Sequence, residues 1–134
     1  MGKAVFDILR ENGATWIEVP GDFTKRITDD KVQVFLSLSP NGDKLVSYCE
    51  FQFGKVFKQF DLPLNLSIPK SLSYNNVVAN IRNKYLWVNP SNIFMMKNRF
   101  NDQIACTIHP FAYAIIIYGI LDGKEHFETL FFDL

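Results

Sequence analysis

Residues 111–132 read FAYAIIIYGILDGKEHFETLFF, and this stretch predicts the strongest element of the fold. Two apolar runs, 111–121 and 124–132, flank the dipeptide Asp122-Gly123. Aspartate and glycine both tolerate the positive φ that a two-residue type I′ turn requires. The stretch therefore predicts an antiparallel β-hairpin in which Leu121 lies opposite Lys124.

Both faces of this predicted hairpin are unusually apolar. Pairing about the turn makes one face almost wholly apolar and leaves the other apolar at the end far from the turn. A hairpin with one face in water would alternate more cleanly between apolar and polar residues. We therefore expect the hairpin to be central in a sheet, to be covered by a helix, or to form an oligomer interface. The interface would consist of Ile115, Ile116, Ile117, Tyr118, Leu130 and Phe131.

Other strands are predicted upstream of the hairpin. Residues 32–39 alternate, and a turn of the Asn-Gly kind at 40–43 joins them to a partner strand over 45–53. The segment 64–68 is bounded by prolines, so it is expected to be a strand at a sheet edge or only a short strand. The charged stretch 22–31 is expected to be an exposed connection. Further short strands are predicted over 15–19, 55–62, 85–88, 93–96 and 103–109.

Two segments have helical periodicity instead. From Tyr74 to Tyr85, apolar residues recur at spacings of three and four, and Ser73 is a suitable N-cap, which predicts a helix over 73–83. A second short helix is expected over 3–12, ended by Gly13. The expected fold class is α+β and predominantly β: a small antiparallel barrel or strongly curved sheet with two short flanking helices.

Length and composition are those of a globular protein. A chain of 134 residues, 48% hydrophobic and 21% charged, fits a single domain over residues 1–134. No signal peptide or membrane span is evident in the sequence, so a cytoplasmic protein is expected. The two cysteines, Cys49 and Cys106, are interpreted as buried thiols, although their separation in sequence leaves a disulfide possible.

The sequence contains no recognised pattern for catalysis or metal binding. His109 precedes Pro110 at a predicted strand end, and His126 lies in the hairpin, so neither is placed beside a nucleophile. No glycine-framed serine, Cys-x-x-Cys pair, carboxylate-rich loop or phosphate-binding glycine run is present. We therefore expect a non-enzymatic protein without a cofactor or metal.

The charge is distributed unevenly although the net charge is zero. Residues 44–100 carry eight Lys or Arg and two acidic residues, whereas 101–134 carry one Lys and five acidic residues. In the basic region, cations are interleaved with aromatic residues, a pattern typical of proteins that bind single-stranded nucleic acid. The candidate nucleic-acid-binding residues are Lys55, Phe57, Lys58, Lys84, Tyr85, Trp87, Phe94, Lys97 and Arg99.

A protein–protein interaction module is the alternative function. Nucleic-acid-binding proteins are usually more basic overall than this chain, which favours the alternative. Under this hypothesis the C-terminal hairpin assembles the chain into a homo-oligomer or binds a protein partner. An abundance of Asn, Lys, Ile and Phe suits an AT-rich genome, so such a structural or inhibitor protein could be of phage or mobile-element origin.

Overall fold

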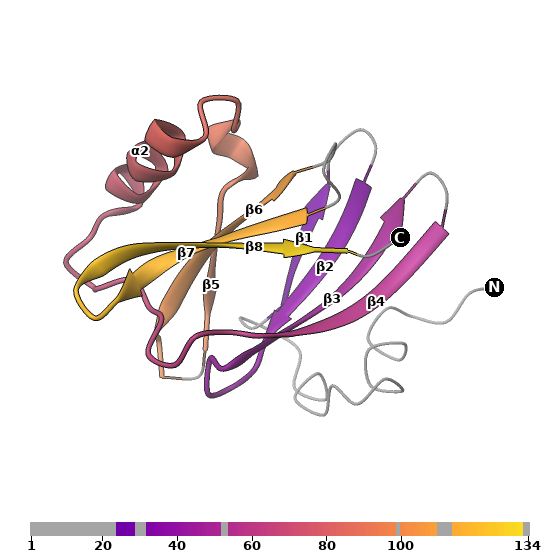
Figure 1. The fold of residues 1–134 in the computed structure, drawn as a ribbon, viewed down its shortest axis with the longest axis horizontal. Helices are drawn as coiled ribbons and strands as arrows, with labels where there is room; N and C mark the ends of the chain where they lie inside the picture. Colours follow the sequence, from indigo (N-terminus) through magenta and orange to yellow (C-terminus); the bar gives the residue numbers. More distant parts are fainter. Residues whose placement is uncertain (1–23, 29–31, 52–53, 99, 110–113, 133–134) are drawn as a thin grey trace.

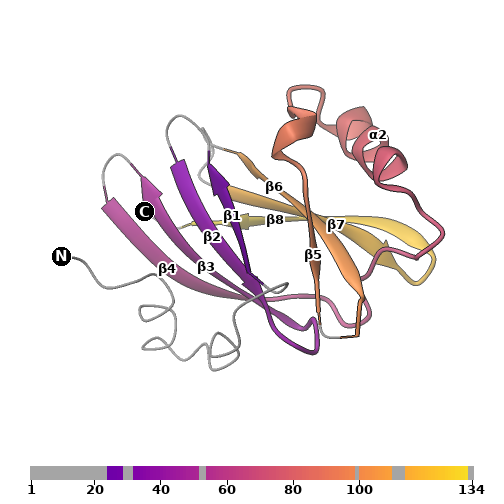
Figure 2. The ribbon, with the colours of Figure 1, turned by 180° about the vertical axis from the view of Figure 1, so that it is seen from behind.

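Two four-stranded antiparallel sheets and one α-helix make up the described part of the chain (Figures 1 and 2). The computed structural model describes residues 24–28, 32–51, 54–98, 100–109 and 114–132. The first sheet contains β1 (Thr24–Thr28), β2 (Val32–Leu38), β3 (Lys44–Phe51) and β4 (Gly54–Asp61). The second sheet contains β5 (Phe94–Lys97), β6 (Gln103–His109), β7 (Ala114–Leu121) and β8 (Lys124–Phe131). Strands in each sheet follow one another in sequence order, so both sheets are meanders.

The main core lies between the two sheets. Alternate residues of β2, such as Val34 and Leu36, belong to the same buried cluster as Ile115 and Ile117 of β7. Because side chains alternate across a strand, each sheet presents one apolar face to the other. The architecture is therefore a sandwich of two packed sheets.

The expectation of a barrel is wrong. A barrel requires a continuous ladder of backbone hydrogen bonds around all of its strands. No described strand of one sheet forms such a ladder with a strand of the other sheet. At one open edge, β4 meets β8 through side chains: the Phe60 and Phe132 ring centroids lie 5.9 Å apart, and Lys58 Nζ donates to the Phe131 carbonyl at 3.1 Å. Alternation predicts one buried face per strand, and it does not distinguish a sandwich from a closed sheet.

The helix α2 (Tyr74–Lys84) packs on the outer face of the second sheet. Ser73 Oγ accepts a hydrogen bond from the Asn76 amide, which confirms the predicted N-cap. Val77 and Ile81 are buried in a second apolar cluster that includes Tyr118 of β7. The described residues contain this single α-helix and a short 3₁₀ turn, η2 (Pro90–Asn92), so two flanking helices are not found there. The helix expected over 3–12 lies outside the described residues.

The predicted C-terminal hairpin is confirmed, with Leu121 paired to Lys124 and positive φ at Asp122 and Gly123. Its apolar faces are both covered within this chain. Ile115 and Ile117 belong to the core between the sheets, whereas Tyr118 packs beneath α2. Helix and sheet together therefore bury β7 on two sides.

The linker after β4 is held between the ends of β6 and β7. The β6–β7 ladder begins at the pair Ala105 and Tyr118, and beyond it both strands pair with the linker instead. Ser67 exchanges two backbone hydrogen bonds with Ile120, at 3.2 and 2.8 Å, and the Ile68 amide donates to Gln103 at 2.6 Å. These bonds attach the chain leaving the first sheet to the second sheet.

Three local expectations are also corrected. Strand β1 lies within 22–31, which was expected to be a connection; an edge strand needs backbone partners on one side only, so its charged residues are compatible with a strand. Residues 64–68 form two isolated bridges instead of a strand. Residues 85–88 form a turn after α2, in which the Tyr85 amide still donates to the Ile81 carbonyl. The predicted strand over 15–19 lies outside the described residues.

Gly119 provides the space that the linker occupies. An added Cβ would lie 2.6 Å from Leu66 Cδ1 and 2.8 Å from Cγ, closer than carbon atoms can pack. We expect Gly119→Ala to lower the free energy of unfolding by about 1–3 kcal/mol, measured by urea denaturation. In a Leu66→Ala background the same change should cost about 1 kcal/mol less. Additive effects of the two substitutions would contradict this contact.

Candidate functional site

Exposed apolar side chains cluster in the turn that follows α2. Val88 is buried, and its amide donates to the Tyr85 carbonyl at 3.1 Å, which closes a tight turn. Because the turn is anchored at both ends, Leu86 and Trp87 between them project outward. Leu86 is 80% exposed and Trp87 is 50% exposed. Exposed apolar side chains that lie side by side are commonly found at binding surfaces.

The Trp87 ring is supported from behind by other rings. Its centroid lies 4.3 Å from that of His109, at the end of β6, and 5.8 Å from that of Tyr85. Tyr85 in turn packs edge-on against Phe127 of β8, with centroids 5.7 Å apart. Lys84 Nζ lies 4.4 Å from the Phe127 centroid, within range of a cation–π interaction. The turn is therefore held against the outer face of the second sheet.

Phe131 extends this surface across the sheet. His109 pairs with Ala114, and Ala114 pairs with Phe131, so the three residues form one row across β6, β7 and β8. Residues directly paired across strands have side chains on the same face. Phe131 therefore lies on the face on which Trp87 packs against His109, and it is 54% exposed. We call Lys84, Tyr85, Trp87, His109 and Phe131 the aromatic surface.

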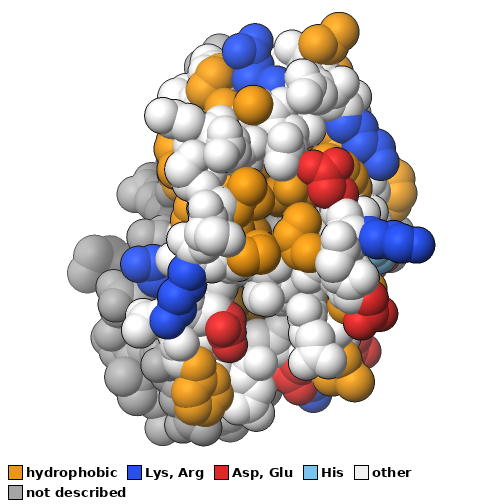
Figure 3. Space-filling model, turned by 90° about the vertical axis from the view of Figure 1, so that its left-hand side faces the viewer, with side chains coloured by type: hydrophobic (Ala, Val, Ile, Leu, Met, Phe, Trp, Pro, Cys, Tyr) orange, Lys and Arg blue, Asp and Glu red, His pale blue; other side chains and the backbone are white. Residues whose placement is uncertain are grey.

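The chain segment that supplies most of this surface has basic residues and no acidic ones. Residues 62–101 contain five Lys or Arg and no Asp or Glu. Figure 3 shows hydrophobic side chains gathered near the middle of one face, with both basic and acidic side chains around them. Of the nearby acidic residues on β8, Glu125 accepts from the Tyr118 hydroxyl and Glu128 lies 3.0 Å from His126 Nε2. Each of these two carboxylates therefore has a neighbouring side chain as a hydrogen-bond partner.

The structure brings together only some of the predicted nucleic-acid-binding residues. Lys84, Tyr85 and Trp87 are adjacent on the aromatic surface. Lys55 and Phe57 lie on the outer face of the first sheet, where Lys55 is 3.8 Å from Glu50 and Phe57 pairs with Tyr48. The predicted set therefore does not line one groove.

Of the remaining predicted residues, those that the structure describes belong to neither group. Lys58 is directed toward the sandwich edge, where it contacts the Phe60 ring and the Phe131 carbonyl. Phe94 packs against the main core, and Lys97 is exposed at the end of β5. Arg99 lies outside the described residues. Of the described ones, only Lys58 approaches the aromatic surface.

The predicted oligomer interface lies mostly inside the chain. Ile115, Ile116, Ile117, Tyr118 and Leu130 are buried within the single chain, and Phe131 alone of the six is exposed. Sequence reasoning did not assign Leu86 or His109 to a site. The signal for Leu86 was its position directly after the helix, where the apolar stripe of α2 has ended.

Two further observations bear on chemistry. Cys49 and Cys106 are buried thiols in the main core and form no disulfide. Burial raises the pKa of Cys49, so its thiol stays protonated at neutral pH. Among the described residues, no three His, Cys, Asp or Glu side chains are arranged to hold a metal ion.

Within the same residues, no helix is long and apolar enough to cross a membrane.

Comparison with known proteins gives no relative: no family model, curated protein or solved structure matches the chain.

Thr107 lies beneath the aromatic surface and has an unsatisfied hydroxyl. It precedes His109 by two residues on β6, and its Oγ1 is buried without a hydrogen-bond partner among the described residues. Burying such a group costs about 1–3 kcal/mol. Thr107→Val keeps the shape and removes the hydroxyl, so we expect a higher midpoint in thermal denaturation. Thr129→Val, an exposed position on the same face, should leave the midpoint unchanged, and a lower midpoint for Thr107→Val would contradict the assignment.

Proposed function

We propose that this protein binds single-stranded nucleic acid, without catalysis, through the aromatic surface. The observation that carries the proposal is the half-exposed Trp87 ring, which is supported by His109 at 4.3 Å and has Lys84 close by on Tyr85 and Phe127. The expected compartment is the cytoplasm.

Stacking on a base is the interaction that this ring is suited to make. Every base has a flat π face, so an exposed aromatic ring binds single strands with little dependence on sequence. Each such contact contributes about 1–3 kcal/mol. A ring already packed against His109 and Tyr85 loses little conformational freedom on binding, which preserves more of that energy.

Local charge supports the same function despite the neutral total. Lys84 and Arg82 lie in the last turn of α2, directly before the exposed turn. They belong to the stretch 62–101, which has no acidic residue to oppose a phosphate backbone. Screening limits charge interactions to about 8–10 Å at physiological salt, so the charges close to the surface dominate over the distant acidic residues.

The test is a titration of a fluorescently labelled oligonucleotide, followed by anisotropy at two salt concentrations. Trp87→Ala should weaken binding by about 5- to 150-fold, as expected for the loss of one stacked base. Lys84→Ala should weaken binding and reduce the slope of log affinity against log salt by about 0.7, as expected for one lost phosphate contact.

A matched control distinguishes this surface from general electrostatic attraction. Lys55→Ala removes the same charge from the outer face of the first sheet, and it should leave both affinity and salt slope unchanged. Far-UV circular dichroism checks that each variant is folded. Absence of binding at low salt, or equal losses for Lys84→Ala and Lys55→Ala, would contradict the proposal.

Self-association or binding of a protein partner is the second candidate function. It is favoured by Leu86, whose 80% exposed aliphatic side chain offers no face for a base. Leu86→Ser should then abolish self-association in light scattering and leave oligonucleotide affinity intact. Loss of oligonucleotide affinity in Leu86→Ser, with no change in mass, would instead assign Leu86 to the nucleic-acid site.

A further inference from the structure

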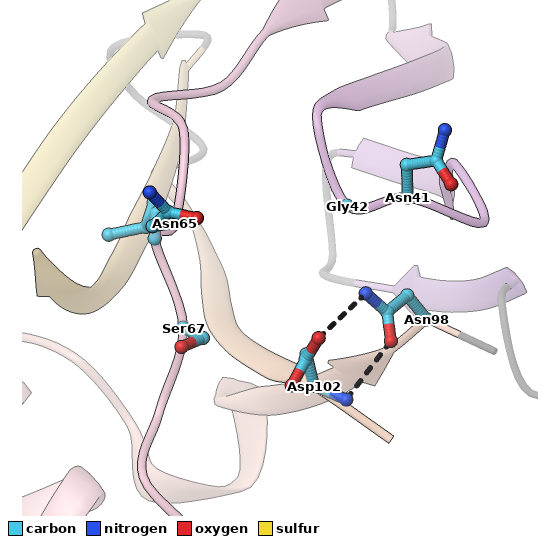
Figure 4. Close-up of a pocket in the computed structure, with 7 residues that line it drawn as sticks. Asn41, Gly42, Asn65, Ser67, Asn98 and Asp102 are labelled. Carbon is cyan, nitrogen blue, oxygen red and sulfur yellow. Dashed lines mark hydrogen bonds between the residues drawn. The ribbon is translucent and has the colours of Figure 1, made fainter. Parts of the chain in front are cut away.

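A polar cavity of about 250 Å³ lies beside the linker after β4 (Figure 4). Three separate segments line it: the β2–β3 turn, the linker itself, and the β5–β6 turn. The lining residues are Asn41, Gly42, Asn65, Leu66, Ser67, Asn98 and Asp102. None of them belongs to the aromatic surface, so a ligand of this cavity would be independent of the proposed nucleic-acid binding.

The walls of the cavity are held in place by the fold. Asn98 is 4% exposed, and its Oδ1 accepts from the amides of Phe100 and Asp102 at 2.9 and 3.0 Å. Its Nδ2 donates to Asp102 Oδ2 at 3.4 Å, and a Cβ added to Gly42 would lie 3.1 Å from the same Nδ2. The opposite wall is fixed because the Ser67 backbone pairs with Ile120. A preformed cavity loses little free energy in ordering when a ligand enters.

Several polar groups in the cavity have unused hydrogen-bonding capacity. In the described part of the chain, the side chains of Asn41, Asn65 and Ser67 make no hydrogen bond, and Asp102 accepts through one carboxylate oxygen only. Figure 4 shows Asn65 and Ser67 on the linker across from Asn98 and Asp102. Amide and hydroxyl groups both donate and accept, whereas the carboxylate accepts only. The cavity thus offers a mixture of donors and acceptors.

This mixture selects one class of ligand. No Lys, Arg or His lines the cavity, which disfavours a phosphate or another anion. The single carboxylate, beside amide donors, is a poor match for Ca²⁺, which takes six to eight oxygen ligands. A hydroxyl group donates and accepts at once, so several hydroxyls on a compact ligand satisfy this lining. Leu66 supplies one apolar wall for C–H groups.

We propose that this cavity binds a small neutral polyol, such as a monosaccharide, through Asp102, Ser67 and the amides of Asn65 and Asn98. The ligand's hydroxyls donate to the free Asp102 oxygen and accept from the amide groups. The hydrogen bond to Asp102 involves a charged acceptor and therefore contributes most.

The test is a ¹H–¹⁵N NMR titration of the full chain with glucose, galactose, mannose and inositol at millimolar concentrations. At least one should shift the amide signals of Ser67 and Asp102 in a saturable manner. Asp102→Ala and Ser67→Ala should each weaken that affinity, by about tenfold for Asp102→Ala. Asp61→Ala and Ser71→Ala, exposed positions outside the cavity, are the matched controls and should bind as the unmodified chain does.

Three results would overturn the proposal. The first is that none of the four compounds shifts the cavity signals. The second is that CaCl₂ or inorganic phosphate shifts them instead. The third is that Asp102→Ala and Ser67→Ala, with spectra showing a folded chain, bind as tightly as the two control variants.

Discussion

The burial of β7 on both faces is the constraint on which the rest of the structure depends. Ile115 and Ile117 pack against the first sheet, and Tyr118 packs under α2. A strand that is apolar on both sides must be covered twice, because its uncovered face would leave a large apolar area in water. The sandwich supplies one cover and the helix the other. The linker that leads from β4 to α2 is secured by its backbone pairing to Ile120 of the same strand.

This arrangement also determines where a ligand can bind. The outer face of the second sheet is covered by α2 over Tyr118, and the chain then turns so that Tyr85 packs on Phe127 and Trp87 packs on His109. The aromatic surface is therefore continuous with the part of the second sheet that α2 covers. Tyr85 and Phe127 pack against the apolar cluster under α2, whereas the rings of Trp87 and Phe131 remain half exposed. One turn thus contributes both to stability and to the candidate site.

Local patterns in the sequence predict elements well and their assembly poorly. The Asp122-Gly123 turn specifies the register of the hairpin, and Ser73 with the stripe through Val77 and Ile81 specifies α2, because these signals depend on neighbouring residues only. Whether alternating strands close into a barrel depends on edges far apart in sequence. For the same reason the spacing of cations and rings grouped Lys55 with Lys84, although Lys55 lies on β4 of the first sheet and Lys84 ends α2, over Phe127 of the second sheet. The sequence predicts a strand in place of the turn after α2, because the run from Tyr85 to Val88 is short and apolar.

Native-state hydrogen exchange of the backbone amides tests the central claim most directly. If β7 is covered on both faces by its own chain, the amides of Ile115, Ile116, Ile117 and Tyr118 exchange only through global unfolding. Their protection should then equal the unfolding free energy measured by denaturation and should not change on dilution. Amides of the edge strand β4 should exchange faster through local opening. Protection of β7 that is no higher than that of β4, or that falls on dilution, would contradict the account.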